Sequence, residues 1–116
     1  MAAGLNAAAL HIGGAAIATA IAWVQIHTAT PSSGGSNEAT SARQAVTLSD
    51  TGGVITASAA VNFTGGAASG PALFLGYWSA STAGTFYGYE ALTGDQTFNA
   101  AGQYTVNSIT ITGSST

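Results

Sequence analysis

The chain has 116 residues and only 4% of them are charged, with one basic and four acidic side chains and a formal net charge of -3. An ordinary soluble domain carries roughly 25% charged residues, which keep surfaces apart and protect sheet edges. A single arginine excludes the cationic surface that binding to nucleic acid or anionic lipid requires. The absence of cysteine excludes a disulfide framework and a thiolate metal site. The composition therefore indicates one small domain that packs inside an assembly.

The first thirty residues contain no Asp, Glu, Lys or Arg. Alanine-rich sequence predicts a short helix from Leu5 to about Ala16, with the pair Gly13-Gly14 as its stop signal. The segment is rich in Ala and Gly and lacks flanking basic residues, which disfavours a membrane span or a signal peptide. We expect residues 1–17 to form an attachment segment and residues 18–116 a single β-sandwich domain. The apolar side chains expected to make the attachment are Leu5, Leu10, Ile12 and Ile17.

The rest of the chain reads as short strands separated by turns of small residues. A strand is expected over residues 18–28, followed by a Ser/Gly loop after Pro31. Residues 42–48 and 54–63 predict a hairpin around the turn at 50–53. Further strands are expected at 72–79, 85–92, 97–99 and 103–112. Six to eight short strands at this spacing predict an all-β fold, an antiparallel sandwich or jelly-roll with a short N-terminal helix.

Four short segments occur in a recognisable order: IHTATP at 26–31, ARQAVT at 42–47, LGYWSA at 75–80 and GTFYG at 84–88. With Asn37-Glu38 in the intervening loop, they resemble a family of small bacteriophage proteins labelled tail fibre or minor tail protein. Thr30 stands where the family usually has Asp, and Tyr77 where Leu is common. The resemblance implies a structural protein on the exterior of the virion, decorating the capsid or associated with the tail. It also implies a homo-oligomer, with a trimer as the expected state, packed on a lattice of major capsid or tail protein.

Glu38 and Arg43 are the only opposite charges close together in the sequence, and we expect an ion pair that fixes the Ser/Gly loop. The aromatic residues of 77–89 are expected in the core or in a subunit interface. In the alternative interpretation Tyr87 and Tyr89 form an exposed platform for a sugar, and the chain is a carbohydrate-binding module that recognises a host receptor.

No arrangement of residues points to an enzyme, a catalytic residue, a metal site or a cofactor. His11 and His27 lie on separate predicted elements without a third ligand. Glu90 and Asp95 are a formal carboxylate pair, but nothing in the sequence divides them into an acid and a base. We therefore predict a non-enzymatic structural protein.

Overall fold

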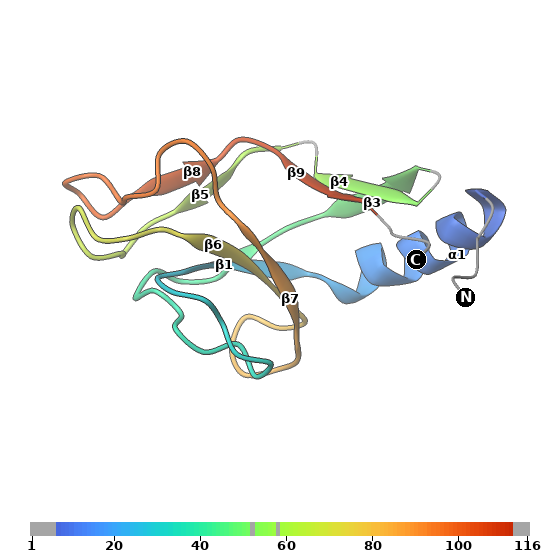
Figure 1. Ribbon diagram of the computed structural model, residues 1–116, viewed down its shortest axis with the longest axis horizontal. Coiled ribbons are helices and arrows are strands. Elements are labelled where there is room, and N and C mark those ends of the chain that lie inside the picture. The colour runs from blue at the N-terminus through green and yellow to red at the C-terminus, as the bar shows by residue number, and fades with distance from the viewer. Residues whose placement is uncertain (1–6, 52, 58, 113–116) are drawn as a thin grey trace.

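The computed structural model describes residues 7–51, 53–57 and 59–112, with side chains from Gly14 to Ile111. Within these residues one helix precedes nine strands, which are all paired antiparallel (Figure 1). The elements are α1 (Ala7–Ala20), β1 (Trp23–His27), β2 (Gln44–Ala45), β3 (Leu48–Thr51), β4 (Val54–Ala57), β5 (Val61–Phe63), β6 (Phe74–Trp78), β7 (Phe86–Ala91), β8 (Tyr104–Val106) and β9 (Ile109–Thr112).

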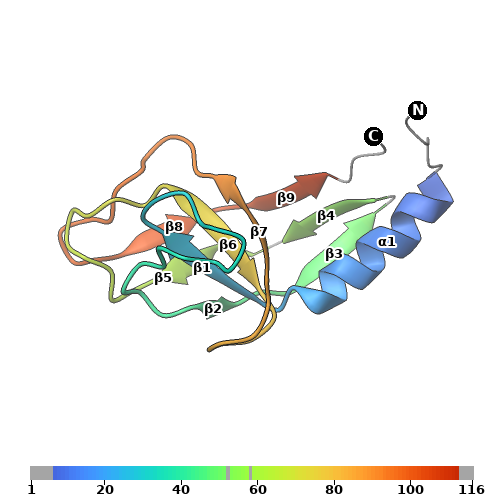
Figure 2. The ribbon, with the colours of Figure 1, turned by 60° about the horizontal axis from the view of Figure 1, so that its bottom comes forward.

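The strands form two layers. One layer is a four-stranded sheet in the order β2-β1-β6-β7. The other layer consists of the sheet β3-β4-β9 and the pair β5-β8, which follow one another along the molecule (Figure 2). The predicted antiparallel sandwich with an N-terminal helix is confirmed.

The core lies between the two layers and extends to the C-terminal end of α1. Alternating side chains of each strand point inward, as a sandwich requires. Its fully buried members include Val24, Ile26, Ile55, Phe63, Leu75, Phe98 and Ile109.

The predicted helix stop at Gly13-Gly14 is wrong, because α1 continues through both glycines to Ala20 and packs against β3 and β4. Gly14 is buried, and a Cβ atom built on it would overlap the carboxylate of Asp50 on β3. The glycine therefore serves as a point of close approach between helix and sheet rather than as a terminator. The helix crosses the expected boundary at residue 17, and the strand expected from residue 18 begins only at Trp23.

The predicted hairpin is correct at its turn and wrong in its extent. Strands β3 and β4 pair around the turn, and the Gly53 N–H donates to Asp50 Oδ1 at 2.9 Å. Residues 44–45 instead pair with β1, and the stretch 54–63 divides into β4 and β5, which join different sheets. Alanine has little preference for strand, so the alternation through Ala59 could not hold one continuous strand. Ala59 is exposed at the break.

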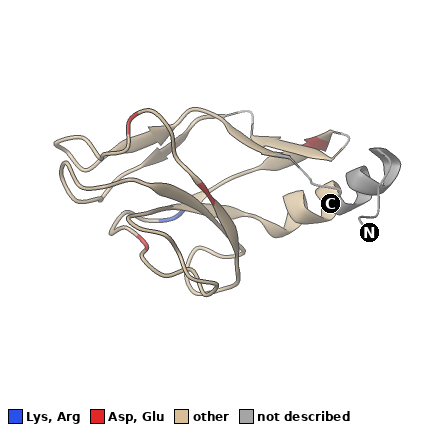
Figure 3. Cartoon of the chain, viewed as in Figure 1, with Lys and Arg blue, Asp and Glu red and all other residues tan. Residues whose placement is uncertain are grey.

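The described charged residues are few, and apart from the neighbours Glu38 and Arg43 they are scattered along the fold (Figure 3). Among the described residues, no helix has the length and hydrophobicity needed to cross a membrane.

Replacing Gly14 tests the close approach of α1. Gly14→Ala gains helix propensity of up to about 1 kcal/mol, yet we expect it to lower the free energy of unfolding by about 1–3 kcal/mol, because the added methyl displaces the Asp50 carboxylate from its bond to the Gly53 N–H. Urea unfolding measures the change. Ala15 is exposed, so Ala15→Gly should cost only the propensity difference of about 1 kcal/mol. A Gly14→Ala protein more stable than wild type would contradict the packing described.

Candidate functional site

Arg43 is the centre of the most connected polar cluster. Its Nε and Nη2 donate to the two carboxylate oxygens of Glu38 at 2.7 and 3.1 Å, a two-bond ion pair. Its Nη1 donates to the backbone carbonyls of Ala80 and Ala83 at 2.9 and 2.8 Å. Four of the five guanidinium N–H groups thus have partners. The Arg43 side chain is only 6% exposed, so these bonds compensate for its loss of water.

The guanidinium also stacks on Trp78, with Cζ 3.5 Å from the centroid of the indole. Arg43 thereby joins the loop that carries Glu38, the start of β2, the end of β6 and the turn between β6 and β7. Gly35 brings the loop backbone against the same indole: a Cβ built there would lie 2.5 Å from the ring, and its φ of 79° favours glycine. The loop of residues 28–41 is therefore fixed on the outer face of the sheet.

His27 is fully buried in this cluster. Its Nδ1–H donates to the Ser36 carbonyl at 2.8 Å, and its Nε2 accepts the indole N–H of Trp78 at 3.4 Å. This pattern fits the neutral imidazole with the proton on Nδ1. Burial lowers the pKa of His27, opposed by the bond to the Ser36 carbonyl and the charge of Glu38, and assisted by Arg43. The ring is a structural core histidine. It occupies space that is open only because Gly76 has no side chain.

An apolar groove lies between α1, β6, β7 and β9. Its volume is about 540 Å³ and no charged residue lines it. Ile17, Tyr87 and Tyr89 are the large hydrophobic side chains recorded as exposed in the described part of the chain, at 46%, 49% and 45%. All three line this groove. Apolar side chains gathered in this way are typical of an interaction surface.

The structure thus brings together residues that the sequence analysis treated separately. Ile17, an expected attachment residue, faces the same groove as Tyr87 and Tyr89, the expected sugar platform. Leu5 lies outside the described residues. Leu10 and Ile12 are on α1, but their side chains lie outside the described ones. The stacking of Arg43 on Trp78 was not predicted, because the two residues are about 35 positions apart and no sequence pattern joins them.

Beneath the groove, the Tyr77 hydroxyl donates to Glu90 Oε1 at 2.6 Å. Burial, then the bond to Glu90 and the charge of that carboxylate, raise the pKa of Tyr77 well above its ordinary value. The hydroxyl therefore stays protonated and holds the Glu90 carboxylate against the sheet.

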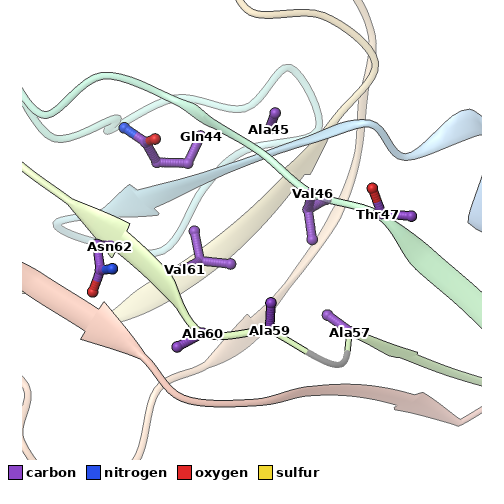
Figure 4. Close-up of a pocket in the computed structure, with 9 residues that line it drawn as sticks. All are labelled: Gln44, Ala45, Val46, Thr47, Ala57, Ala59, Ala60, Val61 and Asn62. Carbon is purple, nitrogen blue, oxygen red and sulfur yellow. The ribbon is translucent and has the colours of Figure 1, made fainter.

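A second groove of about 340 Å³ lies between residues 44–47 and 57–62 (Figure 4). Val46 points into it from one wall, and Val61 and Ala59 point in from the other. Gln44 and Asn62 supply its only side-chain amides. The lining offers too few convergent polar groups to orient a small ligand.

No arrangement in the described part of the chain resembles a reaction centre. No group of three or more His, Cys, Asp or Glu side chains that could hold a metal ion is found among the described residues. Asp95 binds the N–H and hydroxyl of Thr97, whereas Glu90 binds Tyr77, so the two carboxylates serve local structure. The feature suited to binding is the apolar groove, whose side chains can pack against another surface.

The described residues thus form a small, charge-poor β-sandwich with an exposed apolar groove, a feature typical of an interaction surface. A comparison with protein-family models gives the family: residues 5–114 match the model described as podophage GP4 fiber I protein gp80. The match covers nearly the whole chain, and the chain belongs to this family of phage fibre proteins. Its role is accordingly structural and tail-associated in a phage. Neither the curated proteins nor the solved structures contain a match to the chain.

Substitutions of Arg43 and Glu38 should lower the free energy of unfolding by different amounts. Arg43→Lys keeps the charge but loses the planar two-bond geometry and the bonds to Ala80 and Ala83, so we expect a loss of about 2–4 kcal/mol in the free energy of unfolding. The Glu38 side chain is 33% exposed, so Glu38→Gln should cost less, about 1 kcal/mol. Urea unfolding of both variants checks the order. Equal losses would mean that the contacts of Arg43 beyond Glu38 contribute nothing.

His27 should make stability depend on pH. Its pKa is lowered in the folded state from the ordinary 6.5, so the unfolded chain binds more protons at mildly acidic pH. Stability should therefore be fully present above about pH 6.5 and decline as the pH falls toward the pKa of the folded state. His27→Asn should be less stable at every pH but should lose most of this slope. Urea unfolding between pH 5 and pH 8 tests this, and an unchanged slope in the variant would contradict it.

Proposed function

We propose that the chain is a repeated structural subunit on the exterior of the phage tail, where it self-associates and packs on a neighbouring tail protein. The family of fibre proteins favours the tail over capsid decoration. The observation that carries the proposal is the uncharged groove lined by Ile17, Tyr87 and Tyr89. Such a surface gains free energy mainly by leaving water, at roughly 25 cal/mol per Å² of apolar area.

Two features support a passive role. The carboxylates of Glu38, Glu90 and Asp95 each accept hydrogen bonds from neighbouring residues of the fold. The rarity of charge lets neighbouring subunits approach without like-charge repulsion or the cost of burying unpaired ions. In a repeated structure, many weak contacts of this kind add up to stable attachment. Residues 1–17, which end at the groove, are the proposed attachment segment.

Locating the protein on the phage tests this function. Antibody raised against the purified chain and coupled to gold should label the tail of intact particles in electron micrographs. A particle that lacks the gene is the control for non-specific labelling. Labelling distributed over the head would support capsid decoration and contradict the tail assignment, and unlabelled particles with no chain in their protein content would contradict a virion role altogether.

Binding of a host carbohydrate is a second candidate, because Tyr87 and Tyr89 are about half exposed. Exposed tyrosine rings can stack on sugar rings. For this function, Tyr87→Ala should abolish glycan binding on an array while changing the free energy of unfolding by less than about 0.5 kcal/mol. Wild-type protein that binds no glycan on an array of host surface polysaccharides would remove this candidate.

A further inference from the structure

A cleft lies between the Ser/Gly loop and β7, where the loop covers the outer face of the four-stranded sheet. Its volume is about 420 Å³, within the range of about 300–1,000 Å³ that is usual for small-molecule sites. One wall consists of Pro31, Ser32 and Ser33, and the other of residues 86–89. This loop cleft is separate from the groove beside α1, although residues 87–89 line both.

The ring of Tyr89 lies on the outer face of the sheet. On β6, Leu75 and Tyr77 belong to the core, so the alternating residue Phe74 points outward. The Tyr89 ring meets Phe74 edge to face, with 5.3 Å between the ring centroids, and its centroid lies 6.4 Å from that of Phe86, with the planes within 11° of parallel. Tyr89 is nevertheless 45% exposed. It therefore presents a ring that two neighbours hold in place, at little cost in side-chain entropy.

The loop wall of the cleft is held in place as well. The Gly35 backbone lies against two rings, because a Cβ atom built there would lie 2.5 Å from the Trp78 ring and 2.9 Å from the Phe86 ring. The Gly35 N–H donates to the Ser32 carbonyl at 2.9 Å, and Pro31 is buried. The loop cleft is therefore preformed, which lowers the entropic cost of binding a ligand.

The lining of the cleft combines two kinds of group. Phe86 and Tyr89 offer ring surface, whereas the hydroxyls of Ser32 and Ser33 have no hydrogen-bond partner among the described residues. A sugar has the matching chemistry, since the C–H face of its ring packs on an aromatic ring while its hydroxyls exchange hydrogen bonds at the rim. A purely apolar occupant would bury the serine hydroxyls without partners, which costs free energy.

The distribution of charge favours an uncharged sugar. No charged side chain is among the described residues that line the cleft. The chain has one basic residue, Arg43, whose side chain is 6% exposed and paired with Glu38. It is therefore not available to neutralise a carboxylate or phosphate on a ligand. The formal net charge of -3 would also repel an acidic polysaccharide.

We propose that the loop cleft binds a sugar unit of an uncharged polysaccharide, with the sugar ring on Tyr89 and the sugar hydroxyls bonded to Ser32 and Ser33. This inference rests on the second candidate function, carbohydrate binding, and gives it a site and a class of ligand. Of the two grooves, Ile17 lines the one beside α1 and Ser33 lines the loop cleft. Attachment to a neighbouring protein and sugar binding can therefore be tested separately.

Affinity electrophoresis with a defined probe tests the proposal. Polysaccharide is released from the envelope of cells that the phage infects and is separated by anion exchange into an uncharged and an acidic fraction. In native gels, the uncharged fraction should retard the wild-type chain in proportion to its concentration. The acidic fraction should leave the mobility unchanged, because the cleft has no cation to receive it.

Variants of the two walls locate the site. Tyr89→Ala should weaken binding of the uncharged fraction roughly tenfold, because the ring beneath the sugar is lost, whereas Tyr89→Phe keeps the ring and should keep most of the affinity. Ser33→Ala should weaken binding by about two- to tenfold through the lost hydrogen bond. Ser108 is an exposed serine outside the cleft, so Ser108→Ala should bind as wild type. Circular dichroism confirms that each variant is folded, and the pair of serine variants does not depend on the packing of Tyr89.

The outcomes separate this inference from the function on which it rests. If the wild type and all four variants bind the uncharged fraction equally, carbohydrate binding stands and the loop cleft is not its site. Binding of the acidic fraction alone would overturn the assignment of an uncharged ligand. Binding of neither fraction would overturn both the inference and the carbohydrate candidate, whereas gold labelling of the tail would still establish the structural role.

Discussion

The structure depends most on the enclosure of its only basic side chain. The Arg43 side chain is 6% exposed, and it contacts Glu38, two carbonyls of the β6–β7 turn and the Trp78 ring at once. A buried guanidinium without these partners would cost several kcal/mol, so the surrounding segments have to keep their positions. The long Ser/Gly loop and the β6–β7 hairpin are thereby fixed to the same sheet, and the position of β7 follows from that constraint.

Sequence patterns predicted the parts of this structure that local physics determines. Most of the strands, the turn at 50–53 and the proximity of Glu38 to Arg43 follow from alternation, turn residues and opposite charge. Residues 97–99, predicted as a strand, form only an isolated bridge at Thr97. The patterns did not predict what depends on distant partners. Gly14 reads as a helix stop unless Asp50 is known to lie against it, and the groove combines α1 with β7, about seventy residues further along the chain. Stacking of Arg43 on Trp78 is likewise a tertiary contact.

The fold shows how a chain with so few charged residues distributes its polar and apolar side chains. The clustered polar groups around Arg43 and His27 satisfy one another inside the protein, while the large apolar side chains exposed among the described residues line the groove beside α1. Specificity within the domain thus comes from a few buried polar contacts, and the proposed association would use neutral surface. This division is consistent with the family of phage fibre proteins to which the chain belongs.

Residue-resolved amide hydrogen exchange of the wild-type protein tests most directly whether Arg43 makes the loop part of the folded body. The Thr28 N–H donates to Asn37 and the Ala39 N–H to Ile26, both at 2.9 Å, at the two ends of the loop. If the enclosure of Arg43 fixes the loop, both amides should exchange as slowly as those of β6, through the same global opening. Exchange of these amides orders of magnitude faster than β6 would show that the loop opens independently, and would contradict the central role given to Arg43.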